Sequence, residues 1–76
     1  MAKKREDQEI KEAIARNVKG YAFAHSLTME RVALKARMST SSLYNKLRGR
    51  SEWTLKELCS LARVCEMNVV DIMTVK

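Results

Sequence analysis

The stretch that decides the fold is residues 28–50, TMERVALKARMSTSSLYNKLRGR, which has the pattern of two short helices joined by a tight turn. Thr28 is a good N-cap for the first helix, because its hydroxyl can accept a hydrogen bond from a free amide of the first turn. Ser39 is placed to cap a second helix, residues 40–48, in the same way. Gly49 suits the left-handed residue that follows a helix end. The stretch therefore predicts a helix, a turn and a second helix.

Each of these two helices has one apolar face. In the first, residues 28–36, the apolar side chains are small: Val32, Ala33 and Ala36. In the second, Leu43 and Leu47 are four residues apart and share the inward face. We expect the two faces to pack together, with Met38 filling the corner at the turn. The outward face of the second helix is then polar and cationic, and its members are Thr40, Ser41, Tyr44, Asn45 and Arg48.

Positive charge is concentrated on this helix pair. The chain carries a formal net charge of +6 with a pI near 9.7, and residues 28–50 hold six basic residues against one acidic residue, a net charge of +5. The alternative interpretation is that these basic residues only make the protein surface well solvated. Concentration of the charge on the predicted helix pair instead favours an acidic partner such as nucleic acid.

The pattern resembles the helix-turn-helix of the phage repressor and Cro-like family of DNA-binding regulators, also called lambda-repressor-like or XRE-type. In that family the first helix crosses the DNA backbone and the second enters the major groove. The resemblance covers roughly residues 8–72, and the matching residues are Val32, Ala33, Met38, Leu43 and Leu47. Two positions depart from it. Arg37 stands where a turn glycine is usual, at a cost of roughly 1 kcal/mol if it is left-handed, and Lys46 stands where an apolar residue is common.

The resemblance implies roles for individual residues. The residues expected to contact DNA bases are Thr40, Ser41, Tyr44, Asn45 and Arg48. For Tyr44, packing at the edge of the core is an equal alternative. The residues expected to contact phosphates are Thr28, Met29, Ser39, Lys46, Arg50 and Ser51. Lys3, Lys4 and Arg5 form a possible arm against phosphates, the alternative being a frayed, solvated end over residues 1–5.

The N-terminal part of the chain predicts another helix. From about Asp7 to Ala24, apolar residues recur at helical spacing: Ile10, Ile14, Val18, Tyr21 and Ala22. Gly20 lies within this helix, where it costs about 1 kcal/mol relative to alanine. Either a close helix crossing or an early helix end would explain it.

The C-terminal part predicts two more helices. Thr54 and Glu57 form a capping box, and Trp53 is placed to pack back onto the helix as a hydrophobic staple. That helix carries one apolar face and ends near residue 63 or 64; the members of the face are Leu55, Leu58, Leu61 and Ala62. Asn68 is a candidate cap for a short fifth helix. The sequence thus predicts an all-α, compact bundle of about five helices containing a helix-turn-helix, as a single domain over residues 1–76 with residues 1–6 flexible.

Catalytic and metal-binding patterns are missing from the sequence. His25, the only histidine, is expected at a helix C-terminus, and Cys59 and Cys65 are expected to be packed, reduced thiols. Their spacing fits neither a redox pair nor a zinc ligand set. We therefore predict no enzyme activity, no metal and no cofactor. The N-terminus lacks a signal-peptide pattern and no stretch has membrane-spanning length, which predicts a cytoplasmic protein without membrane contact.

The function that these observations favour is sequence-specific binding of double-stranded DNA by a transcriptional regulator. By the resemblance, it would be a repressor that occupies a pseudo-palindromic operator as a homodimer, without a small-molecule substrate. Apolar residues near the C-terminus are candidates for the dimer contact: Val69, Val70 and Met73. The alternatives are a protein-interaction module, such as an antitoxin or adaptor, on the same scaffold, and non-specific nucleic-acid binding.

Overall fold

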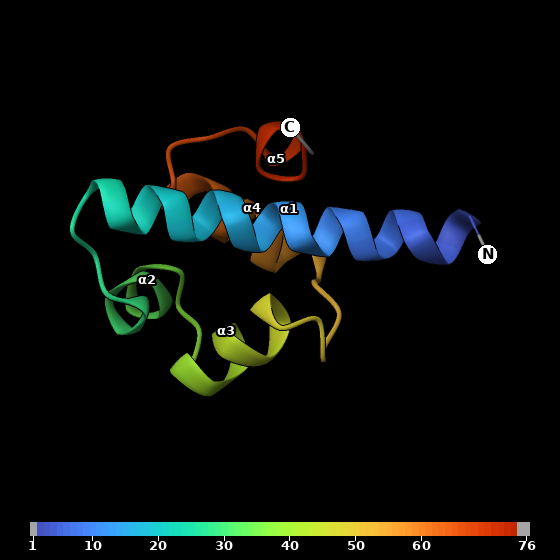
Figure 1. Cartoon of the computed structure of the whole chain (residues 1–76). Coiled ribbons are helices and arrows are strands. Elements are labelled where there is room, and N and C mark those ends of the chain that lie inside the picture. The colour runs from blue at the N-terminus through green and yellow to red at the C-terminus, as the bar shows by residue number, and fades with distance from the viewer. Residues whose placement is uncertain (1, 75–76) are drawn as a thin grey trace.

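The computed structural model describes the backbone of residues 2–74 and the side chains of residues 7–74. Within this part the chain forms five helices and no strand: α1 (Ala2–Ala24), α2 (Met29–Lys35), α3 (Thr40–Leu47), α4 (Leu55–Val64) and α5 (Val69–Ile72). The long α1 crosses the molecule, with α2 and α3 on one side of it and α5 on the other (Figure 1). The predicted all-α bundle of about five helices is confirmed.

Helix α1 is longer than predicted. It begins at Ala2, five residues before the expected start at Asp7. The side chains of Lys3, Lys4 and Arg5 lie outside the described residues, so their predicted contact with phosphates stays a prediction.

Gly20 lies inside α1, four residues before its last residue Ala24, and both reasons proposed for it are wrong. The helix continues past it to Ala24, and a Cβ built on Gly20 would meet no atom within 4 Å. This glycine therefore marks neither a helix end nor a close helix crossing.

The core lies between α1 and the other four helices. The α1 stripe is confirmed, because Ile14, Val18 and Ala22 are buried. The small face of α2 and the two leucines of α3 are buried as predicted, and Ala33 is only 1% exposed. The largest fully buried side chains are Ile14, Leu43, Leu61, Ile72, Val18 and Val32.

Four helices end in the same kind of turn. A residue in the left-handed region follows each helix: Ser26 (φ 56°), Arg37 (φ 61°), Gly49 (φ 79°) and Glu66 (φ 55°). The amide of the next residue then bonds back to a carbonyl five residues earlier, which is the Schellman motif. These bonds are Leu27 N to Ala22 O (2.8 Å), Met38 N to Ala33 O (2.9 Å), Arg50 N to Asn45 O (2.9 Å) and Met67 N to Ala62 O (2.9 Å).

The residue that follows each left-handed position has one of two environments. Leu27, Met38 and Met67 are partly buried and pack against the core. After α3 the corresponding residue is Arg50, which is exposed. The predicted left-handed conformation of Arg37 is confirmed, and the turn tolerates it because Met38 anchors the chain directly afterwards.

Helix α4 begins with the predicted capping box. The Thr54 hydroxyl accepts from the Glu57 amide at 3.1 Å, and the Glu57 carboxylate accepts from the Thr54 amide at 2.9 Å. Trp53 packs against the core as expected. Leu55 was predicted on the apolar face but is 71% exposed, because it occupies the first turn on the solvent side.

Helix α5 differs in detail from its prediction. Asn68 occupies the N-cap position, yet its side chain makes no capping hydrogen bond. Val69 and Met73 pack against the core, whereas Val70 is 74% exposed. Of the three apolar residues predicted for a dimer contact, only Val70 is therefore available for one without rearrangement.

Candidate nucleic-acid interface

The α2–α3 pair has the capped geometry that the sequence predicted. Thr28 Oγ1 accepts from the Arg31 amide at 3.1 Å, and Ser39 Oγ accepts from the Ser42 amide at 3.1 Å. Each cap satisfies one free amide and fixes where its helix begins. The helix that we expected to enter a DNA groove is thus held at its N-terminus as well as through its buried leucines.

The outward face of α3 is polar and accessible. Ser41, Asn45 and Arg48 are exposed, and Thr40 and Tyr44 are half-buried at its edge. Leu43 and Leu47, on the inward side of the helix, are buried. The structure therefore brings the five predicted base-contacting residues together on one side of one helix.

Tyr44 and Arg48 form a pair on this face. The guanidinium carbon of Arg48 lies 5.6 Å from the centroid of the Tyr44 ring, within the range of a cation–π contact. They are four residues apart, which is the spacing of neighbours on a helix surface. Tyr44 is not among the side chains packed against the core. Its ring instead supports the Arg48 side chain at the edge of the face.

The residues predicted to contact phosphates have different surroundings. Thr28, Ser39 and Arg50 are exposed, and Ser51 is half-buried. The side chain of Met29 packs against the core, so only its backbone amide, at the first position of α2, is available to an anion.

Lys46 is not a surface residue, and the prediction that it contacts phosphates is withdrawn. It is 9% exposed. Its Nζ donates to the carbonyl oxygen of Glu52 at 2.8 Å and pairs with Glu57 Oε1 at 3.1 Å. A lysine so buried needs partners of this kind, because an unpaired buried charge is costly. The lysine that stands here in place of the usual apolar residue thus has its partners inside the protein.

The Glu57 carboxylate joins two structural elements at this point. The hydrogen bond from the Thr54 amide, together with the bond from Lys46, lowers the pKa of Glu57 below its ordinary value. Glu57 therefore caps α4 and neutralises Lys46 of α3 with the same group. Sequence analysis found the cap, but it missed the ion pair, which joins residues eleven positions apart in the chain.

Three further basic residues near the candidate interface had no role assigned to their side chains. Arg31, Lys35 and Arg37 are exposed, and no ion pair involves them in the part of the chain that the structure describes. Sequence analysis counted Arg31 and Lys35 only as part of the charge excess, and it considered Arg37 only for its backbone conformation. Their position on α2 and its turn keeps the surface beside α3 positive.

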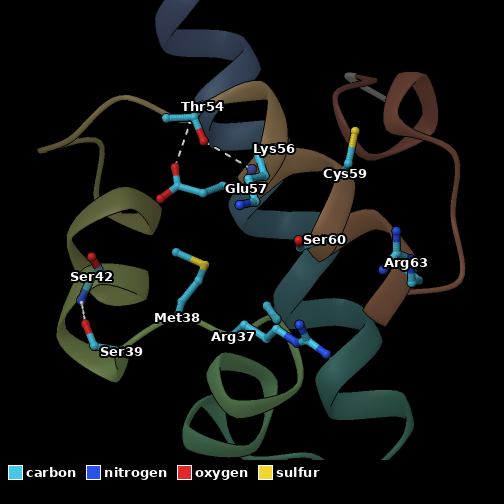
Figure 2. Close-up of a pocket in the computed structure, with 11 residues that line it drawn as sticks. Arg37, Met38, Ser39, Ser42, Thr54, Lys56, Glu57, Cys59, Ser60 and Arg63 are labelled. Carbon is cyan, nitrogen blue, oxygen red and sulfur yellow. Dashed lines mark hydrogen bonds between the residues drawn. The ribbon is translucent and has the colours of Figure 1, made fainter.

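A cleft of about 700 Å³ lies between the α2–α3 turn and α4. Figure 2 shows Met38 and Glu57 facing each other across it, with Ser39 and Ser42 on the α3 side. Arg37, Lys56 and Arg63 also line it. Because Glu57 is already paired with Lys46, this flank of α3 is positive as well.

The two cysteines have opposite environments. Cys65 is buried, and burial raises the pKa of its thiol to about 11. Cys59 is exposed and lines the cleft, so the prediction that it is packed is wrong. Both are free thiols. Among residues 7–74 no three His, Cys, Asp or Glu side chains are grouped so that they could hold a metal ion.

No helix in the described part of the chain has both the length and the apolar character needed to cross a bilayer.

Two solved structures have a fold similar to that of this chain. The chain is similar to two crystal structures of the clp gene regulator ClgR from Corynebacterium glutamicum, each at 24% identity over 83% of this chain. The TM-scores are 0.72 and 0.69, and the matches cover 67% and 82% of the ClgR chains. No family model and no curated protein sequence matches the chain. Over the matched part of the chain, the fold is thus one that ClgR shares.

Proposed function

We propose that this protein is a sequence-specific double-stranded DNA-binding transcriptional regulator of the lambda-repressor-like type, with α3 in the major groove. The observation that carries the proposal is the division of α3 into two faces. One face is buried through Leu43 and Leu47, and the other is an exposed polar surface beside cations that are free of ion pairs in the described residues. An α-helix with such a face matches the width of the major groove.

The similarity in fold to ClgR, a regulator of clp genes, supports the proposal. The simplest mode of action is repression, in which the protein occupies an operator and blocks other proteins from it. In this proposal the protein acts as one cytoplasmic domain.

Side chains on α3 carry the sequence preference. Asn45 is suited to a bidentate contact with adenine and Arg48 to one with guanine. Thr40 and Ser41 lie in the first turn, nearest to the base edges. Tyr44 holds Arg48 in place and offers its ring to a thymine methyl group.

Groups at the ends of the helices hold the phosphates. Thr28 and the Met29 amide begin α2, where free amides and the helix dipole attract an anion. Ser39 serves the same role at the start of α3. Arg50 and Ser51 follow α3 and face the opposite strand. These contacts set position without distinguishing bases.

Two copies on a pseudo-palindromic site are part of the proposal. One α3 contacts few base pairs, so useful specificity requires a second copy on a half-site about 34 Å away. Val70 is the exposed apolar residue of α5 that we place at the contact between copies.

The experiment begins with selection of a preferred duplex from random DNA, followed by salt titrations on that duplex and on an unrelated one. Asn45→Ala should lose about 1–3 kcal/mol of discrimination per half-site, with little change on unrelated DNA. Arg50→Ala should weaken binding to both duplexes and reduce the magnitude of the slope of log K against log salt by about 0.9 per half-site. Equal losses for Asn45→Ala on both duplexes would contradict the placement of α3. If the wild type binds no DNA but captures a protein partner, and Asn45→Ala and Arg50→Ala each abolish that capture, the interaction-module alternative is favoured.

A further inference from the structure

The loop between α3 and α4, residues 48–54, contains both phosphate-contacting residues proposed after α3, and it is held at three points. At its start, the Arg50 amide bonds to the Asn45 carbonyl at 2.9 Å, and Gly49 supplies the left-handed turn. At its end, the capping box fixes Thr54. Between them, Glu52 is held through both its backbone and its side chain.

Lys46 makes the internal contact. Its ammonium group donates to the Glu52 carbonyl at 2.8 Å and pairs with the Glu57 carboxylate at 3.1 Å. One buried charge on α3 therefore joins the middle of the loop to the cap of α4. A charge-assisted bond of this kind is among the stronger ones in a protein, especially where water is largely excluded.

Lys11 makes the external contact. Its ammonium group lies 2.9 Å from the Glu52 carboxylate, whose side chain is 85% exposed. The Lys11 side chain is 18% exposed, but an ion pair whose carboxylate is open to solvent is well screened and contributes little on its own. The hold on the loop therefore depends mainly on Lys46.

We infer that Lys46 is a positioning residue for DNA binding: through Glu52 and Glu57 it fixes the loop that presents Arg50 and Ser51 to the phosphate backbone. The inference rests on the proposed function. Lys46 itself touches no DNA, because its ammonium group is buried and engaged. Its effect on DNA comes through Arg50, whose backbone is ordered before a phosphate arrives, so that binding does not have to order it.

The chemistry of the position supports a role beyond filling space. Replacing both partners of a buried ion pair with apolar groups is often neutral for stability or favourable, so filling space at this position does not by itself call for a lysine. An apolar residue would leave the Glu52 carbonyl and the Glu57 carboxylate without this donor. What lysine adds at this position is thus a connection between α3, the loop and α4.

The test is a double-mutant cycle between Lys46→Met and Arg50→Ala, measured on the selected duplex at a temperature where circular dichroism shows every variant folded. In the wild-type background Arg50→Ala should weaken binding on the order of tenfold. In the Lys46→Met background the same change should cost about threefold or less, because an arginine on a loose loop contributes less. Lys19→Met, at an exposed position on α1, is the matched control and should leave the Arg50→Ala loss at its wild-type size.

A second measurement does not depend on DNA. Backbone order parameters from NMR relaxation should fall at Arg50, Ser51 and Glu52 in Lys46→Met, from about 0.85 toward 0.6, while those of α1 stay unchanged. If Lys46→Met does not fold, Lys46→Gln replaces it, since glutamine stays polar but removes the charge and has a side chain one bond shorter than that of lysine.

The outcomes separate the two proposals. Equal Arg50→Ala losses in both backgrounds, or loop order parameters equal to those of the wild type, overturn the positioning role of Lys46. A wild-type protein that binds no duplex overturns the proposed function, and the order parameters then decide the role of Lys46 in the loop by themselves.

Discussion

Replacing Gly20 with alanine should stabilise the protein. Gly20 lies within α1, and an added Cβ would meet no atom within 4 Å. No packing gain or clash therefore enters, and the expected effect is the intrinsic difference between glycine and alanine in a helix, about 1 kcal/mol. For a domain of this size that corresponds to a rise in Tm of about 4–8 °C.

The assay is thermal and urea unfolding followed by circular dichroism, in which the urea midpoint should rise with an unchanged m-value. Gly49→Ala is the control of opposite sign. Gly49 has φ 79°, where alanine is strained by roughly 1 kcal/mol, so this variant should be less stable than the wild type. DNA affinity should be unaffected by Gly20→Ala. A Tm for Gly20→Ala at or below the wild-type value would refute the placement of Gly20 at an exposed position within a continuous helix.

Three further predictions concern the core, the cap and the thiols. Ala33→Leu should destabilise the protein by about 1–3 kcal/mol through overpacking, and an unchanged thermal melt would show that the helix pair is misplaced. The lowered pKa of Glu57 means that its ionised form stabilises the folded state at pH values above the ordinary pKa of 4.5. Glu57→Gln should therefore be less stable than the wild type at neutral pH, and the difference in unfolding free energy should shrink as the pH falls through the folded-state pKa. A difference that stays constant from pH 7 to pH 3 would contradict this linkage. At pH 8 a thiol reagent should modify Cys59 rapidly and Cys65 only on unfolding, and rapid modification of both would contradict the burial of Cys65.

Features that depend on near neighbours were predictable from the sequence. Thr28, Ser39 and the capping box of α4 are recognised from residues three apart, because a cap bonds within the first turn. The buried stripes follow from helical periodicity. The left-handed conformation of Arg37 was expected from the family resemblance, in which a turn glycine is usual at this position.

Features that depend on distant partners were not predictable in this way. Lys46 looked like a surface cation because its neutralising group, Glu57, belongs to the next helix. Leu55 was assigned to the apolar face by helical spacing and Cys59 to a packed position by residue type, although both are exposed. Periodicity gives the width of an apolar face only roughly, and tertiary packing decides its edges.

The sequence predicted which residues lie on the outward face of α3, but not how that face is held. The outward face of α3 is as the sequence suggested. What the sequence lacked was how that face is held: the Tyr44–Arg48 contact, and the bonds from Lys46 that fix the loop around Arg50. The bonds from Lys46 require knowing which side chains are near one another in three dimensions, whereas Tyr44 and Arg48 are neighbours four residues apart on one helix.

The turn shared by the ends of α1, α2, α3 and α4 has a consequence for how this protein can be altered. Leu27, Met38 and Met67 follow the left-handed residue in three of these turns and belong to the core, so changing them disturbs the whole molecule. The same position after α3 is Arg50, whose side chain is exposed, while its backbone keeps the shared hydrogen bond. Residue 50 is therefore a site where selection, natural or in the laboratory, can vary the side chain freely without changing the scaffold that carries it.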